Sequence, residues 1–199
     1  MKKNPFRKRT FFRKETSLRK KPDWKLWLKD KKECKVWLDI YIKKRILEKK
    51  KDESRLYFNK AEHNLNLANW LDAKHENEIP EMFGEETFYD WVLSMYYYAV
   101  YHAGLALVSK LLFRSKSHTA TLCFLIYYYY HKEEIIDEED VELIAISLEK
   151  EDIETITSVK SLRERASYDV HALFEKEIAE DARDKAVAFL EKVREVIQE

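Results

Sequence analysis

The chain has 199 residues, is 45% hydrophobic and 37% charged, and contains only 2 Gly and 3 Pro. This composition excludes a fold of many short strands, whose turns need Gly and Pro, and it predicts an almost entirely helical protein. The formal net charge of zero conceals an asymmetry, because residues 1–51 hold 21 Lys and Arg against 6 Asp and Glu while the rest of the chain holds 16 against 31. A segment this basic either folds onto the acidic part or binds a polyanion such as RNA or anionic lipid.

The first 51 residues are predicted to form a basic N-terminal extension. Residues 1–22 have no apolar periodicity and carry ten basic residues against Glu15 alone, so we expect disorder there. Residues 24–49 predict an amphipathic helix, although the run VWLDIYI within them would also tolerate a strand. Two interpretations stay open: the arm holds RNA phosphates while Trp24, Trp27 and Trp37 stack on bases, or its helix docks on the acidic body and the lysines are solvated.

The pattern of apolar residues over 52–199 predicts a helical body. The first helix has one apolar stripe, and the stretch NEIPEMFG after it contains a Pro and a Gly that end it. A long helix over 86–112 follows, and FRSKSH forms the next connection. The stripe of the first helix consists of Tyr57, Ala61, Leu65, Ala68 and Leu71.

The segment from Trp91 to Ser109 carries no formal charge and approaches the length of a membrane span. It also contains four tyrosines and His102, and the chain has no second candidate. We therefore expect the central helix of a soluble bundle and no transmembrane segment. His102 is then a core histidine bonded to a tyrosine or to the backbone.

Three further helices complete the body. We expect a tyrosine-rich helix over 119–130 that His118 caps or orients, a fourth helix from about 139 towards 162, and a last helix with acids in its first turn. The fold class is therefore all-α, an antiparallel up-and-down bundle of four to five helices with a basic extension. The tyrosines favour a core or dimer-interface position over base stacking. The stripe of the last helix consists of Ile178, Ala182, Ala186, Phe189, Val193 and Val196.

The chain offers little for metal or redox chemistry. Cys34 and Cys123 are far apart in the sequence and lack the spacing of a zinc site or of a disulfide framework. No apolar stretch of signal-peptide length follows the basic N-terminus. We expect a cytoplasmic protein without metal or cofactor.

Three motifs together resemble the HEPN family of small helical-bundle domains. They are YYYAVYHAGLALVSKLL (96–112), SHTATLCFL (117–125) and LRERASYD (162–169), the last followed by an acidic, alanine-rich helix. The resemblance covers about residues 54–197 and is closest to the branch with Leu-Arg and Tyr-Asp before the last helix. It implies a homodimer, often paired with a nucleotidyltransferase-type partner protein in a toxin–antitoxin-like system.

The resemblance also implies an activity, because many HEPN members are metal-independent endoribonucleases. Their motif separates an Arg from a His by four to six residues, and Arg165 and His171 here have five between them. In the branch named above, Arg163 takes the place of the family arginine, and Tyr168 stands where the ribonucleases carry His. The candidate site residues are therefore Arg163, Arg165, Tyr168 and His171.

These residue types suit metal-free RNA cleavage. Histidine can transfer the proton of the 2′-hydroxyl or of the leaving oxygen, and the arginine fork matches phosphate oxygens. On one continuous helix Arg165 and His171 would lie roughly 240° apart, so a helix break is needed, and Asp169 could cap one. A site shared across a dimer would supply more groups. The alternatives are an Arg–Asp169 ion pair with His171 in solvent, or a non-catalytic subunit that binds a nucleotidyltransferase-type partner.

Overall fold

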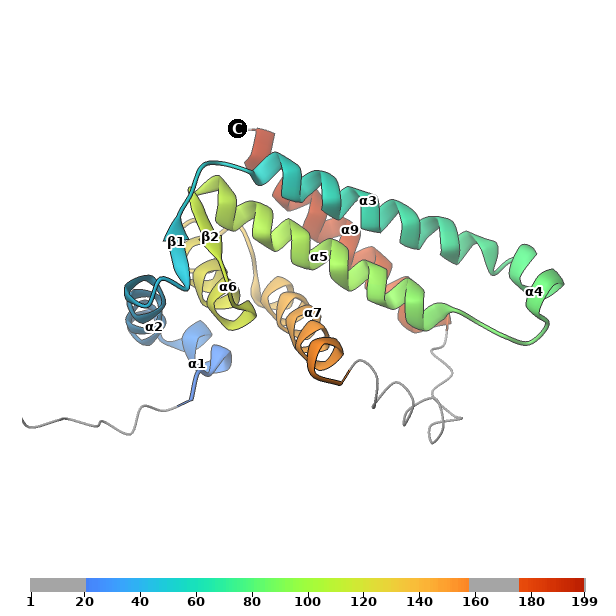
Figure 1. Ribbon diagram of the computed structural model, residues 1–199, viewed down its shortest axis with the longest axis horizontal. Coiled ribbons are helices and arrows are strands. Elements are labelled where there is room, and N and C mark those ends of the chain that lie inside the picture. Colours follow the sequence, from blue (N-terminus) through green and yellow to red (C-terminus); the bar gives the residue numbers. More distant parts are fainter. Residues whose placement is uncertain (1–20, 158–175, 199) are drawn as a thin grey trace, which may run out of the picture.

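Four long helices form the body of the protein in the computed structural model, which describes residues 21–157 and 176–198, with the backbone alone over 148–157. They are α3 (Ser54–Lys74), α5 (Tyr89–Lys110), α7 (Glu138–Thr157) and α9 (Lys176–Gln198). Helix α5 lies at the centre, because α3, α7 and α9 all pack against it. Long helices that follow one another along the chain run antiparallel, whereas α5 and α9 run in the same direction, so that their starts and their ends lie together (Figure 1). The predicted all-α bundle is confirmed.

The apolar stripes of the sequence face this core. Ala61 and Ala68 of α3 are fully buried, as are Ala186 and Phe189 of α9. Ile178 departs from the prediction, since 48% of its surface stays exposed. It lies in the first turn of α9 as the structure describes that helix.

The N-terminal segment differs from the single helix predicted over 24–49. It forms α1 (Trp24–Lys29) and α2 (Lys31–Lys43), followed by strand β1 (Leu47–Lys49). The carboxylate of Asp30 accepts bonds from the backbone N–H groups of Lys32 and Glu33, so it caps α2 and ends α1. The run VWLDIYI lies within α2 and is helical.

A two-stranded antiparallel sheet joins this segment to the body. Strand β1 pairs with β2 (Phe113–Ser115), with Leu47 opposite Ser115, and β2 lies in the predicted connection FRSKSH. The chain enters the two strands through Arg45 (φ 56°) and Leu112 (φ 63°), both in the left-handed region that glycine usually fills. Because these turns contain no glycine, they could not be recognised from the sequence.

Residues 24–49 share one hydrophobic core with the rest of the chain. Trp27, Cys34 and Leu38 are fully buried, and α1 and α2 pack on α6 (His118–Leu125) and the π-helical turn η1 (Ile126–Tyr130). The Nε2 atom of His131 lies 2.7 Å from the backbone oxygen of Trp27 and adds a polar link to this contact.

The tyrosine-rich segment lies in the core, as predicted. Tyr129 is 2% exposed, and its hydroxyl donates to the backbone oxygen of Leu107 at 2.7 Å. Close packing of α6 on α5 needs Gly104, because a Cβ there would lie 3.2 Å from Leu125 Cδ1. In the parts of the chain that the structure describes, none of the helices combines the length and hydrophobicity that a membrane crossing requires.

Candidate functional site

The predicted site residues Arg163, Arg165, Tyr168 and His171 lie outside the described residues, as does Asp169. Lys176, the first residue of α9, follows His171 by five positions.

An open pocket of about 330 Å³ adjoins the start of α9. It lies between the C-terminal end of α3, the first turn of α5 and the first two turns of α9. Its walls come from residues Asn69, Asp72, Ala73, His75, Glu76, Tyr89, Lys176, Glu180 and Arg183. The sequence could not reveal this pocket, since Asp72 and Arg183 are far apart in the chain and share no local motif.

Hydrogen bonds at both ring nitrogens hold the imidazole of His75 in one orientation. Its Nδ1 lies 3.0 Å from the backbone oxygen of Leu71, and its Nε2 accepts the backbone N–H of Phe88 at 2.9 Å. Only the neutral ring with its proton on Nδ1 satisfies both bonds. The ring also stacks on Tyr89 with centroids 4.0 Å apart. His75 therefore orders the pocket wall and has no nitrogen left for proton transfer.

The charges of the pocket are already paired. Arg183 Nη1 lies 3.7 Å from Asp72 Oδ2, and Lys176 Nζ lies 3.6 Å from Glu180 Oε1. Glu76 adds a third carboxylate, so the described lining has one more anion than cations. A lining with an excess of negative charge disfavours the binding of a phosphate group. A phosphate site in this pocket would therefore need further cations, such as the arginines of residues 158–175.

Tyrosine hydroxyls around the pocket are held neutral. Burial, followed by the nearby Asp72 carboxylate, raises the pKa of Tyr89. The same two causes raise the pKa of Tyr96, whose hydroxyl donates to Asn69 Oδ1 at 2.9 Å. Both tyrosines are hydrogen-bond donors at physiological pH and not general bases.

The motif residues of α5 and of α6 (His118–Leu125) meet in a second cluster. The ring of Tyr101 packs edge-on against His102 and also against His118, with centroids 5.3 and 5.2 Å apart. His102 Nδ1 lies 2.7 Å from the backbone oxygen of Tyr98, which confirms its prediction as a core histidine. Burial lowers the pKa of His102, so its ring is neutral at pH 7.

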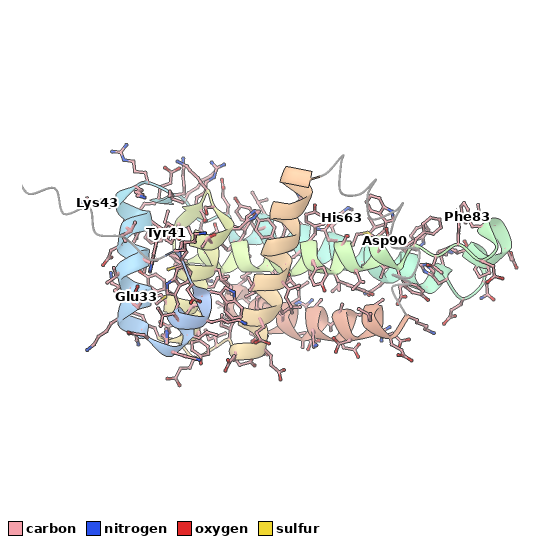
Figure 2. The ribbon with its side chains drawn as sticks, turned by 90° about the horizontal axis from the view of Figure 1, so that it is seen from below. Glu33, Tyr41, Lys43, His63, Phe83 and Asp90 are labelled. Atoms are coloured by element: carbon pink, nitrogen blue, oxygen red, sulfur yellow. The ribbon has the colours of Figure 1, made fainter. Side chains whose placement is uncertain are left out.

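The opposite end of the molecule carries a concentration of cations. Residues 21–51 contain 12 Lys and Arg against 5 Asp and Glu, and β2 adds Arg114. Most of these side chains are exposed and form no ion pair within the described ranges. We call eight of them the basic end: Lys25, Lys29, Lys32, Lys43, Lys44, Arg45, Lys50 and Arg114. Figure 2 shows Lys43 at this end, far from Phe83 at the other.

The predicted role of the tryptophans in base stacking needs a correction. Trp27 is fully buried, so it cannot stack on a base. Trp37 packs between Trp27 and Tyr41, and its indole N–H donates to Glu33 at 3.2 Å. Of the three, only the half-buried Trp24, with Lys25 Nζ 5.5 Å from its ring centroid, resembles a stacking platform.

Across residues 21–157 and 176–198, no three His, Cys, Asp or Glu side chains gather in a way that could hold a metal ion. No protein-family model and no curated protein matches this chain.

Proposed function

We propose that the protein is an RNA-interacting, HEPN-type component of a toxin–antitoxin-like pair, and that RNA phosphates bind at its basic end. The observation that carries the proposal is the group of eight exposed cations at that end, which form no ion pair within the described residues. Each phosphate that a Lys or Arg neutralises releases counterions, which favours binding at low salt. The sequence adds nine further Lys and Arg in residues 1–20, which join the described chain at Lys21.

The geometry of the basic end suits an extended backbone more than a single phosphate. Its cations lie on α1, on α2, on the turn after α2, directly after β1 and on β2. The β1–β2 pairing brings Arg114 beside the segment that follows α2. The described cations are mainly lysines, and lysines act as point charges without base readout. Binding is therefore expected to depend strongly on salt and weakly on sequence.

The proposal includes cleavage as the activity of this component. The residues for it are Arg163 and Arg165, which would hold the phosphate, and His171, which would transfer a proton; Tyr168 would donate a hydrogen bond. The support is the HEPN resemblance together with the fold class, which that family shares. No step needs a metal ion: a base takes the proton of the 2′-hydroxyl as its oxygen attacks the adjacent phosphorus, an acid gives a proton to the departing 5′-oxygen, and a cyclic phosphate end remains.

A non-catalytic subunit is the second candidate. The observation that favours it is that His75 and His102 hydrogen-bond to the backbone, while the pocket charges are already paired. The described residues thus act as a scaffold, and the protein would bind a nucleotidyltransferase-type partner through the same bundle. This candidate predicts an inert purified protein that forms a stoichiometric complex.

One experiment separates binding from cleavage. Labelled RNA is incubated with the full chain in EDTA, beside the Arg165→Ala and His171→Ala variants and a Lys43→Glu/Lys44→Glu/Arg45→Glu variant. The proposal expects cyclic-phosphate products from the parent, bound but intact RNA with the first two, and weak binding with the triple variant. Binding without cleavage in all proteins supports the non-catalytic subunit. If every variant binds and cleaves RNA as the parent does, the assignment of these residues is rejected.

A further inference from the structure

The end of the molecule opposite the basic end exposes large apolar side chains. Residues 75–91, which we call the acidic tip, include the short helix α4 (Glu78–Phe83). Met82 is 72% exposed, Phe83 is 45% exposed and Trp91 is 62% exposed. Phe83 marks this end in Figure 2. Apolar side chains gathered on a surface in this way are typical of interaction sites.

The acidic tip is held in place by packing contacts and by a hydrogen bond. Ile79 is 5% exposed and anchors α4, while Phe83 packs edge-on against Phe88 with centroids 5.2 Å apart. The bond from the Phe88 backbone N–H to His75 fixes this segment against the end of α3. A partner can therefore bind the tip without first ordering it, which lowers the entropic cost of association.

The charge of the tip indicates what chemistry would cover it. It contains six acidic residues and no Lys or Arg: Glu76, Glu78, Glu81, Glu85, Glu86 and Asp90. Of these, Glu78 is paired with Lys74, and all six are exposed. A complementary partner is a basic segment with apolar side chains spaced along it.

Residues 1–20 of this chain have that chemistry. They carry nine Lys and Arg against Glu15, with Phe6, Phe11 and Phe12 between the cations. We propose that residues 1–20 of one copy dock on the acidic tip of a second copy, with phenylalanines against Met82 and Phe83 and cations beside the glutamates.

The distance from Lys21 to the acidic tip disfavours docking of residues 1–20 on the tip of their own copy. Residues 1–20 join the described chain at Lys21, near the basic end, and the 21 residues of α3 alone span about 32 Å towards the tip. With the roughly 10 Å diameter of α2 added, about twelve extended residues would be needed to reach the tip. Phe11 and Phe12 would then fall short of the apolar surface, and of the three phenylalanines only Phe6 could reach it. A second copy removes this constraint.

Zero-length cross-linking of the full chain tests the proposal. A carbodiimide joins a Lys amine to a Glu carboxyl, and a mixture of ¹⁴N- and ¹⁵N-labelled protein identifies links between copies. We expect mixed-isotope peptides that join the lysines of residues 1–20 to Glu78–Glu86. Links confined to one isotope, or links from that segment to other parts of the body, would overturn the proposal.

Self-association of the full chain gives the second measurement. Sedimentation velocity at low salt should show an association that weakens by roughly tenfold in Glu81→Lys/Phe83→Ser and in Phe11→Ser/Phe12→Ser, a loss of about 1.4 kcal/mol. The matched control is Glu191→Lys, which reverses one exposed charge on α9 away from the tip. Circular dichroism checks that each variant is folded. A chain that stays monomeric, or an association equal in all four proteins, contradicts the proposal.

Discussion

The Sγ atoms of Cys34 and Cys123 lie 3.9 Å apart, one on α2 and the other on α6. Each Sγ also lies 3.5 Å from the backbone oxygen of the other cysteine. Both residues are fully buried, and burial raises the pKa of the Cys123 thiol. The sequence separation of the two cysteines offered no hint of this contact, which fixes α2 to the body.

We expect both thiols to be unreactive in the folded protein. The thiolate is the reactive form, and burial disfavours it at Cys123. Burial of both side chains also keeps the reagent away from them. With an aromatic disulfide reagent at about pH 8, two equivalents should react at once in guanidinium chloride and slowly in buffer. Two rapid equivalents in buffer would show that α1 and α2 detach from the body.

Alkaline pH should destabilise the fold. Burial raises the pKa of Tyr41 to about 12, against about 10 for an unfolded tyrosine. The folded state therefore keeps its proton while the unfolded state loses one, so the free energy of unfolding falls as pH rises above about 10. Urea titrations from pH 8 upward measure this fall, and the Tyr41→Phe variant should show a shallower one. Equal slopes in the two proteins would rule out this hydroxyl as a cause.

Acid should also destabilise the fold, through His102. Because burial lowers its pKa, the unfolded chain binds a proton more readily than the folded one below about pH 6.5. The free energy of unfolding is therefore expected to fall as pH drops from about 7 to 5. In His102→Gln the part of this fall due to the imidazole should vanish. The comparison uses the change in unfolding free energy with pH, since the substitution also alters the value at pH 7.

Lys192 should stabilise the packing of α9 against the start of α7. Its Nζ donates to Asp137 Oδ2 at 2.8 Å and to Asp140 Oδ2 at 2.6 Å, and the side chain of Asp140 is only 8% exposed. We expect Lys192→Met to lower the free energy of unfolding by about 1–3 kcal/mol, since it leaves a nearly buried carboxylate without its cation.

A matched control for this prediction lies on the same helix. Lys185 pairs with Asp181, and both side chains are more than half exposed. Lys185→Met should change the free energy of unfolding by less than about 0.5 kcal/mol, because water screens an exposed pair. Denaturant titrations of both variants check the contrast, and similar losses would mean that burial of Asp140 does not matter.

The cations of the basic end should determine how strongly RNA binding depends on salt concentration. For single-stranded RNA, each phosphate that the protein no longer neutralises lowers the slope of log K against log salt by about 0.7. Lys43→Glu/Lys44→Glu/Arg45→Glu should therefore weaken binding at low salt and lower the slope by up to about 2. Its control is Lys60→Glu on α3, which alters one exposed cation outside the basic end. Parallel salt plots for parent and triple variant would place the RNA elsewhere.

Periodicity predicted the long helices because each one buries a single face. The spacing of Ala61 and Ala68, or of Ala186 and Phe189, is set locally by the helical repeat, so the sequence was enough to find α3 and α9. The central position of α5 followed from its lack of charge. The tyrosines of η1 were assigned to the core or a dimer interface because aromatic stripes at bundle spacing are usually buried, and Tyr129 lies in the core.

The parts that the sequence did not predict depend on distant partners. Strands β1 and β2 are three residues each and exist because they pair with one another. The break between α1 and α2 depends on one cap, Asp30, inside an otherwise helical pattern. The pocket needs Asp72 and Arg183 to meet across two helices. The predicted Arg163, Arg165, Tyr168 and His171 stay predictions.

The β1–β2 pairing makes the order of synthesis matter for this chain. Leu47 leaves the ribosome well before its partner Ser115, and Cys34 precedes Cys123 by 89 residues. Until α6 emerges, Trp27 and Leu38 have no surface to cover them, so the nascent N-terminal helices are candidates for chaperone binding. For the same reason, removal of residues 1–51 would strip the bundle of part of its interior and leave β2 as an open edge.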